Sequence, residues 1–388
     1  MSQRPLVSVV LNTYNRADLL PCSAESVLSQ DYPNFEVIIV DDCSSDNTPE
    51  VVAAIAAEHG DRVRSVRLSE NSGLAAGRNA GVRAARGPLI AFQDDDDLWL
   101  PGRLTAQVEA LRKHPECALC YGKALVATPE GRPTGETYRN TGMGRTGDNF
   151  EAFLRWGTIV LPATVVRAEV LESVGLFAED LRTGEDTDLL ARLTAEHHAV
   201  YVDRPVMLVR EHEGRKTREE DRSGADVAFG LRVFERLWDN LPPSQEHLRG
   251  LVAARLVRDS LGQLKGHSDA PPGVRELGEL IRSHPEWFRY RDALWMIADE
   301  LVGPGERDGG EVEALAAILE EMPGDRKLTR RRMAMFYGLA ARRAARQRML
   351  GRAAVWCLKA ARHDPWFFAR KEIPQALMPG AGASPCDR

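Results

Sequence analysis

Four consecutive carboxylates, Asp94–Asp97, are the side chains in this 388-residue sequence best suited to chemistry. They follow Pro88–Phe92, an apolar run with the composition of a buried strand, after the single residue Gln93. Adjacent negative charges repel one another, so the cluster is costly unless a cation offsets it. Oxygen ligands favour Mg²⁺ or Mn²⁺, which proteins hold by one or two carboxylates together with substrate phosphates. The competing interpretation is a solvated acidic loop that caps the next helix.

Polar residues also follow two earlier apolar runs. Asn12–Arg16 follows Leu6–Leu11, and Asp41 and Asp42 follow Phe35–Val40. The carboxyl ends of parallel strands meet at one edge of a sheet, and ligands bind there. Asp and Asn favour loops and helix caps, so one such cluster would carry no weight. Three clusters at successive strand ends indicate a site.

Two further groups lie later in the chain. Glu185 and Asp186 open a predicted helix, Asp186–His197, where a positioned carboxylate could take a proton from a hydroxyl group. Compensation of the helix dipole is the alternative role for this acidic pair. His212 follows a predicted strand, Val206–Arg210, and could be a third metal ligand or contact a diphosphate or an acceptor. A surface histidine in a charged loop is the alternative.

The first hundred residues predict the scaffold that would position these groups. Apolar runs alternate with helical stretches, so we expect an α/β fold with a mainly parallel sheet and helices on both faces. In the second helix, Thr48 has the pattern of an N-cap, with Pro49 at the first helical position. The predicted helices are Asp18–Gln30, Thr48–Glu58 and Leu74–Ala85, and the third strand is Val63–Leu68.

The pattern changes along the rest of the chain. A hairpin is predicted at Pro129–Arg132, and short strands at Ala163–Val166, Ala199–Val202 and Val206–Arg210. Helical periodicity dominates after Ser223. We therefore predict a catalytic domain at 1–222 and a helical domain at 223–377 for acceptor or partner recognition or oligomerisation. The small, polar segment 378–388 is expected to be a disordered tail.

Seven segments, taken together in their order along the chain, resemble the family 2 glycosyltransferases, which have the GT-A fold. Any one of the motifs is common, but their joint occurrence is specific, and the resemblance fades near Arg222. The segments are Val7–Val10, Asn12–Arg16, Val40–Asp46, Asn71–Gly81, Ala91–Trp99, Val174–Phe177 and Gly184–Leu189.

The resemblance implies roles for the acidic residues. Asp94 and Asp96 match the metal-binding DxD element, with Asp96 on the divalent ion and Asp94 and Asp95 near the ribose and the metal's waters. Asp186 matches the catalytic base, and Glu185 is its neighbour in the motif. The implied cofactor is Mn²⁺ or Mg²⁺, and we include His212 among the candidate metal ligands.

The resemblance also implies a nucleotide pocket. Asp42 matches the residue that accepts a hydrogen bond from a uracil ring, and Asn12 and Tyr14 match positions that line the base pocket. Arg78 lies where family members approach the nucleotide. Cys43 departs from the small residue, often Gly, that usually follows the aspartate pair. Two further nucleotide-binding candidates in the matched motifs are Arg16 and Asp41.

Sugar transfer gives these groups a consistent chemistry. A divalent ion neutralises the charge that grows on the leaving nucleotide diphosphate, and one carboxylate deprotonates the acceptor hydroxyl. One base and one displacement imply inversion at the sugar. We therefore expect an inverting transferase that uses a UDP-sugar, with a glycan, secondary metabolite, peptide or lipid as acceptor. The alternatives are a sugar-phosphate nucleotidyltransferase, which should carry a Gly-rich phosphate loop after the first strand, and a non-catalytic binding protein on the same fold.

Composition excludes other classes. The net charge of −6 argues against a nucleic-acid binder, and no run approaches the ~20 apolar residues that span a bilayer. We expect a cytoplasmic protein without a transmembrane segment that could form homo-oligomers. Cys117 and Cys120 have metal-ligand spacing, but without a second pair we expect buried thiols. The arginine-rich stretch beginning at Arg330 is predicted to be a solvated helix face, or else a contact for anionic lipid or an acidic partner.

Overall fold

The structure is a computed structural model that divides into two units, Met1–Asp221 and Arg222–Arg388. It describes residues 4–139, 141–181, 183–212, 225–265, 274–301, 310–322, 326–346 and 350–364. The predicted tail at 378–388 lies outside these ranges. Among the described residues, no helix combines the length and apolar character needed to cross a bilayer.

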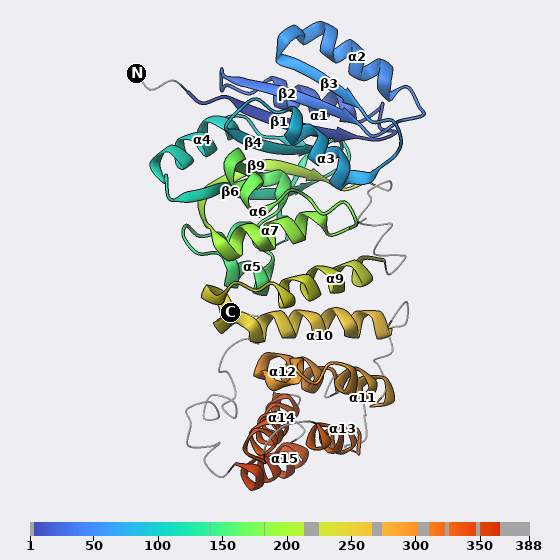
Figure 1. Cartoon of the computed structure of the whole chain (residues 1–388), viewed down its shortest axis with the longest axis vertical. Helices are drawn as coiled ribbons and strands as arrows, with labels where there is room; N and C mark the ends of the chain where they lie inside the picture. The colour runs from blue at the N-terminus through green and yellow to red at the C-terminus, as the bar shows by residue number, and fades with distance from the viewer. Residues whose placement is uncertain are drawn as a thin grey trace. The chain divides into compact units, whose positions relative to one another are not determined.

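The first unit is built on a mixed sheet in the order β3-β2-β1-β4-β8-β6-β9-β5. Figure 1 shows β3, β2, β1 and β4 in the upper part of this sheet. Its first four strands run parallel, and every residue of β1 and β2 is buried. Continuous runs of Val and Ile suit strands that are covered on both faces. These strands are β1 (Val7–Thr13), β2 (Phe35–Asp41), β3 (Val63–Arg67) and β4 (Leu89–Asp94). The predicted α/β fold with a mainly parallel sheet is confirmed.

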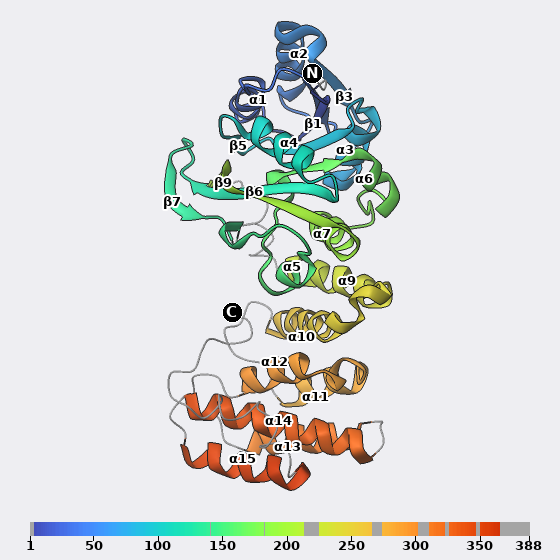
Figure 2. The same ribbon diagram turned by 90° about the vertical axis from the view of Figure 1, so that its left-hand side faces the viewer.

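The second half of the sheet mixes directions. Strand β8 (Thr164–Arg167) is antiparallel to β4 and β6 (Cys117–Ala127), and β6 runs parallel to β9 (His198–Arg210). Two short strands complete the sheet. Strand β5 (Leu98–Trp99) pairs antiparallel with β9, and β7 (Pro133–Thr137) pairs antiparallel with β6. The β6–β7 pair forms the predicted hairpin around Pro129–Arg132 and is well seen in Figure 2.

One strand prediction was wrong. The segments Ala199–Val202 and Val206–Arg210 are parts of a single strand, β9. The register shifts where Gly122 pairs with Val202 and Lys123 pairs with Pro205. Proline has no N–H for the ladder, but a bulge absorbs the mismatch without ending the strand.

Among the described residues of the first unit, seven helices connect or cover these strands. They are α1 (Leu20–Leu28), α2 (Thr48–His59), α3 (Gly73–Ala84), α4 (Arg103–Lys113), α5 (Phe150–Trp156), α6 (Ala168–Val174) and α7 (Glu185–Glu196). The N-cap prediction at Thr48 was wrong, because Thr48 is already the first residue of α2. Its backbone N–H donates to Asp46 Oδ1 at 2.9 Å, and its own hydroxyl accepts from the Arg16 N–H at 3.0 Å.

The second unit is helical throughout its described residues. Its helices bury their own apolar core, which includes Leu256, Ile297 and Phe336, each 0% exposed. The helices are α9 (Ala225–Asp239), α10 (Arg249–Lys265), α11 (Val274–Ser283), α12 (Arg291–Leu301), α13 (Gly310–Glu321), α14 (Arg326–Arg346) and α15 (Leu350–His363). The predicted helical C-terminal region is thus confirmed.

Two glycines let α3 approach the sheet closely. A Cβ atom on Gly81 would lie 2.3 Å from Val10 Cγ1, and one on Gly77 would lie 2.3 Å from Asn12 Nδ2. Real Cβ atoms do not approach other atoms that closely. Helix α3 is therefore held against β1 at the end where β1 carries its polar residues.

We predict that Gly81→Ala destabilises the protein. In an open helix the change would stabilise by about 1 kcal/mol through helix propensity. Here the methyl group meets the buried Val10 side chain, and overpacking should lower the free energy of unfolding by about 1–3 kcal/mol. Denaturant unfolding monitored by circular dichroism measures this. An increase in stability would show that α3 can move away from β1.

Candidate active site

The polar residues that end the first strands lie at one edge of the sheet. The register pairs Thr13 with Asp41 and Asn12 with Asp94, and the Asp42 N–H donates to the Thr13 carbonyl at 3.0 Å. The sheet therefore brings three segments that are far apart in sequence to one rim. This is the edge at which α/β sheets bind ligands.

The acidic cluster is a tight turn between β4 and β5. The Asp97 N–H donates to the Asp94 carbonyl at 3.2 Å, and Gln93 Nε2 donates to the Asp97 carbonyl at 2.6 Å. The carboxylate of Asp97 is buried and accepts the Arg210 N–H at 3.1 Å. Asp97 therefore ties the turn to the end of β9, whereas Asp94, Asp95 and Asp96 are partly exposed.

Asp96 and His212 face each other across the rim. His212 Nε2 lies 3.1 Å from Asp96 Oδ2, and the two side chains are 14% and 16% exposed. The Arg210 Nε group donates to the Asp96 carbonyl, which fixes the turn beside His212. Two neighbouring ligands of an octahedral ion, each at about 2.1 Å, lie about 3 Å apart. The spacing and the carboxylate–imidazole donor set therefore fit a divalent ion such as Mn²⁺ or Mg²⁺.

The remaining carboxylates of the turn are electrostatically strained. Burial and the charge of Asp96 raise the pKa of Asp95 to about 8, although Thr13 and Arg16 act in the opposite direction. Burial also raises the pKa of Asp94, despite the opposing effect of Arg78. Both shifts come from carboxylates crowded together in a poorly solvated place. A bound cation would relieve this repulsion.

Arg78 joins the acidic turn to the start of α7. Its Nη2 donates to Asp94 Oδ1 at 2.9 Å and its Nη1 donates to Glu185 Oε1 at 2.6 Å. Arg78 is 4% exposed, and its guanidinium also lies 5.6 Å from the centre of the Phe177 ring. Burial alone would lower the pKa of Arg78, but Asp94, Glu185 and Asp186 raise it. The structure thus places Arg78 beneath the rim, bound to two carboxylates.

The paired acids at the start of α7 differ in exposure. Glu185 is 4% exposed and accepts from Arg78, whereas Asp186 is partly exposed. Asp186 Oδ1 accepts the N–H of Thr187 at 2.6 Å, which leaves its second oxygen without a hydrogen bond among those the structure gives. The helix begins after Gly184, whose φ of 80° turns the chain into α7. Asp186 is therefore the member of the pair that a bound molecule could reach.

The other nucleotide-pocket candidates lie beside this rim. Asp42 is buried, and its two oxygens accept the N–H groups of Ser72 and Gly73 at 2.7 and 2.9 Å. Asn12 Nδ2 donates to the Leu74 carbonyl at 3.3 Å, and its Oδ1 is buried without a hydrogen-bond partner in the described structure. Tyr14 is 44% exposed, and its N–H donates to Asp95 Oδ2 at 3.3 Å.

Asp41 has a different environment from Asp42. It is buried and accepts from Arg67 Nη1 at 2.6 Å and from the Ser44 N–H at 2.9 Å. These bonds hold the turn that follows β2. Cys43, which replaces the usual small residue, has a φ of 61°, so this turn requires the left-handed conformation that glycine adopts most easily. Asp41 therefore shapes the backbone from which Asp42 is presented.

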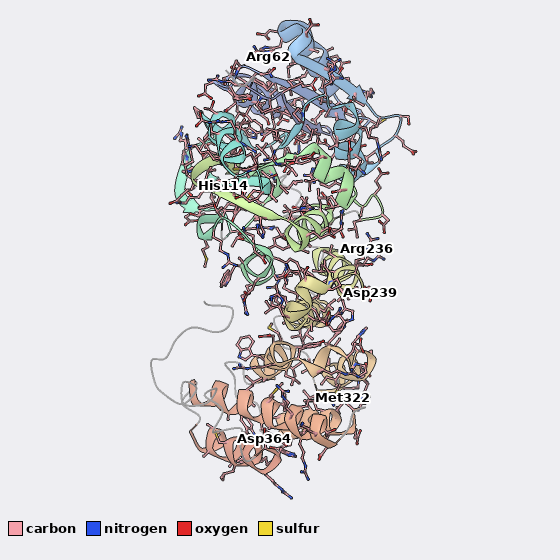
Figure 3. All side chains as sticks on the ribbon, turned by 60° about the vertical axis from the view of Figure 1, so that its left-hand side comes forward. Arg62, His114, Arg236, Asp239, Met322 and Asp364 are labelled. Atoms are coloured by element: carbon pink, nitrogen blue, oxygen red, sulfur yellow. The ribbon has the colours of Figure 1, made fainter. Side chains whose placement is uncertain are left out.

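A second group of possible metal ligands lies away from the rim, at the start of β6. His114, labelled in Figure 3, brings a ring nitrogen within 4.8 Å of ligand atoms of Glu116 and Cys117. His114 is partly exposed and Glu116 is exposed, and His114 Nδ1 lies 3.0 Å from Glu116 Oε1. Cys117 and Cys120 are buried free thiols, as predicted, and burial raises the pKa of both.

Comparison with known proteins identifies the family. The model of "Glycosyl transferase family 2" matches residues 8–175. The succinoglycan biosynthesis protein ExoO of Rhizobium meliloti is 46% identical over 338 residues, which cover 82% of this chain and 94% of ExoO. The chain belongs to glycosyltransferase family 2. It is therefore a transferase.

Other relatives match only in part. The putative teichuronic acid biosynthesis glycosyltransferase TuaG of Bacillus subtilis is 37% identical over 34% of this chain, and the match covers 51% of TuaG. The putative glycosyltransferase EpsE of Bacillus subtilis is 43% identical over 29% of this chain and 41% of its own length. For these two relatives the similarity thus spans about half of the protein or less.

Solved structures support the same fold. S. aureus TarS 1-349 in complex with UDP-GlcNAc matches with a TM-score of 0.55 and 16% identity, over 94% of this chain and 91% of that one. The mannosyltransferase PcManGT of Pyrobaculum calidifontis, in complex with GDP-Man and Mn²⁺, has a TM-score of 0.52 and 18% identity, over 94% and 88%. The family 2 glycosyltransferase therefore has a GT-A-like fold, as the resemblance implied.

Sequence reasoning missed the groups that brace the site. Nothing in the sequence pairs Arg78 with Glu185, because the two residues are 107 positions apart and meet only in the folded protein. Asp97 was counted with the acidic cluster, but it is bound to the Arg210 N–H. The one available signal for the Arg78–Glu185 contact was the arginine itself, which stands among small residues in the predicted helix Leu74–Ala85.

We predict that Arg78→Met lowers the free energy of unfolding by about 3 kcal/mol. Removing one partner of a buried ion pair leaves the other charges uncompensated, and here two carboxylates lose their shared cation. Denaturant unfolding at neutral pH measures the change. The matched control is Arg83→Met on the same helix, whose exposed pair with Glu179 is worth less than about 1 kcal/mol. Equal losses in the two variants would contradict the bracing role.

Proposed function

We propose that this glycosyltransferase moves a sugar from a UDP-sugar to an acceptor hydroxyl, with inversion, and that it requires Mn²⁺ or Mg²⁺. The observation that carries the proposal is the 3.1 Å approach of Asp96 to His212 within a rim of crowded carboxylates. Arg78 connects this rim to the acidic start of α7. One buried side chain therefore links Asp94, a candidate metal ligand, to Glu185, the neighbour of the candidate base.

Asp96 and His212 are the residues that would hold the ion, with Asp94 as a further candidate ligand. When bound, the ion supplies Lewis-acid neutralisation of the diphosphate leaving group. Asp94 and Asp95 would lie near the ribose and the ion's water ligands. The Mn²⁺ in the PcManGT complex supports this assignment.

Asp42, Asn12 and Tyr14 would bind the nucleotide base. Both Asp42 oxygens already accept a backbone N–H, but each carboxylate oxygen has a second lone pair for a donor on the base. The buried Asn12 Oδ1 is a further acceptor. UDP is favoured as the nucleotide because Asp42 matches a uracil-binding position and because TarS binds UDP-GlcNAc. Arg16 would contact the nucleotide from the loop after β1.

Asp186 would deprotonate the acceptor hydroxyl. It is the accessible acid of its pair, while Glu185 is fixed by Arg78. A single displacement assisted by one base inverts the configuration at the sugar, and such a base contributes roughly 10²–10⁴-fold to the rate.

A saccharide is the acceptor that we favour. ExoO, which matches along most of its length, is named for succinoglycan biosynthesis, and TuaG for teichuronic acid biosynthesis. We further propose that the helical unit, Arg222–Arg388, selects the acceptor. The residues proposed to bind the UDP-sugar and the metal ion all lie in the first unit. A nucleotidyltransferase or a non-catalytic binding protein is not favoured, because the family is a transferase family and the candidate metal and base acids are both present.

We predict that Asp96→Asn and His212→Ala each weaken metal-dependent UDP binding by at least about tenfold. Each variant removes one of the two candidate metal ligands, Asp96 and His212, that face each other across the rim. Calorimetric titration of UDP with and without Mn²⁺ measures the effect. The control is Asp61→Asn, which changes an exposed acid elsewhere in the first unit. Unchanged UDP affinity in both site variants would place the ion elsewhere.

We predict that Asp186→Asn keeps donor binding and lowers transfer by roughly 10²–10⁴-fold. A base acts on the acceptor and does not hold the nucleotide. Nucleotide release from a panel of UDP-sugars, together with UDP titration, separates the two properties. Glu196→Gln, at the exposed far end of the same helix, is the control. If UDP affinity falls along with turnover, Asp186 is a binding residue and the assignment is incorrect.

A further inference from the structure

The last two helices of the second unit carry a charge opposite to that of the chain. Residues 326–363 contain 12 Lys and Arg and no Asp or Glu, in a protein whose net charge is −6. The described parts of this segment are α14 and α15, which lie side by side in Figure 2. Such a separation of charge favours an anionic partner for this part of the protein.

Two of these cations are used within the fold. Arg332 is 1% exposed and donates to the Leu319 carbonyl at 3.1 Å, and Lys359 pairs with Glu313. Others in the described structure are exposed, namely Lys327, Arg330, Arg331 and Arg362. The basic segment therefore presents a cationic surface.

Part of this cationic surface gathers around the end of α15. Burial lowers the pKa of His363, Glu320 opposes this, and the charges of Arg362 and Arg330 lower it further. The Tyr337 ring of α14 stacks on the His363 ring of α15, with 5.9 Å between the ring centres, so the end of α15 that carries Arg362 packs on α14. Asp364, labelled in Figure 3, comes directly after this segment and is the first acidic residue that follows it. Residues of two helices thus contribute to one basic area.

Exposed aliphatic side chains lie on α15 beside these cations. Val355 is 50% exposed and Leu358 is 73% exposed, whereas Trp356 and Ala360 on the same helix are buried. Val355, Leu358 and Arg362 follow one another at helical spacing, so they share the outer face of α15. This face of α15 therefore presents two exposed apolar side chains within two turns of an exposed arginine.

We propose that the outer face of α14 and α15 docks on an anionic lipid surface. Exposed Lys and Arg side chains would bind acidic headgroups, and Val355 and Leu358 would enter the boundary with the acyl chains. A nucleic acid or acidic protein would account for the cations but not for the exposed aliphatic pair. The proposal does not depend on the sugar-transfer reaction, so its test requires no substrate.

The test is co-sedimentation of the full chain with phosphatidylcholine vesicles that contain either no or about 30% phosphatidylglycerol. We expect binding only to the anionic vesicles, with an affinity that falls as salt is raised. Replacing Arg330, Arg331 and Arg362 together by Ser should weaken it on the order of 100-fold, since each cation near such a surface contributes roughly fivefold. The control replaces three exposed cations elsewhere, Arg112, Lys113 and Arg275, and should bind like the parent protein.

Leu358→Ser separates a lipid surface from other polyanions. It should weaken binding to the anionic vesicles at least about fivefold and leave binding to a labelled oligonucleotide unchanged. Thermal unfolding verifies that each variant is folded. The proposal is overturned if the triple variant or Leu358→Ser binds anionic vesicles like the parent protein. Equal binding to neutral vesicles, or tighter binding to the oligonucleotide than to anionic vesicles, would also overturn it.

Discussion

Repulsion among the carboxylates at the end of β4 is the constraint on which the rest of the site depends. Asp94, Asp95 and Asp96 are adjacent and only partly exposed, and burial raises the pKa values of Asp94 and Asp95. Arg78 offsets part of this charge on one side, and the His212 ring faces Asp96 on the other. A divalent ion between Asp96 and His212 would complete the compensation. The clustered negative charge destabilises the folded protein, and the same charge would attract a divalent ion, which in turn would bind the diphosphate.

The fold supplies the compensating groups from distant parts of the chain. Parallel pairing of β4 with β1 aligns the acidic turn with the nucleotide-pocket candidates, and β9 brings Arg210 and His212 to the same rim. Helix α3 reaches the sheet closely because Gly77 and Gly81 have no side chains, and it carries Arg78 inward. Arg78 then fixes Glu185, so the position of Asp186 depends on the same ion-pair network.

The sequence predicted the first four strands and their polar ends because continuous Val and Ile runs mark buried parallel strands. It predicted the acidic turn because four consecutive aspartates follow one of these apolar runs. The unbroken β9 was not predicted, since a proline at position 205 suggests a strand end, and the register shift that accommodates it comes from tertiary pairing. The seven-residue helices α5 and α6 are too short for their periodicity to be evident. The Arg78–Glu185 contact could not be predicted, because ion pairs between distant segments leave no local pattern.

Electron paramagnetic resonance of Mn²⁺ can test whether the acidic turn holds a divalent ion together with the nucleotide. Free Mn²⁺ gives a six-line signal that is lost on binding, so a titration counts the bound ions and gives their affinity. The account predicts one ion per chain in the presence of UDP, with clearly weaker binding in its absence, because the diphosphate supplies further ligands. A signal that is unchanged by protein and UDP together would contradict the account, as would Mn²⁺ binding of the same strength with and without UDP.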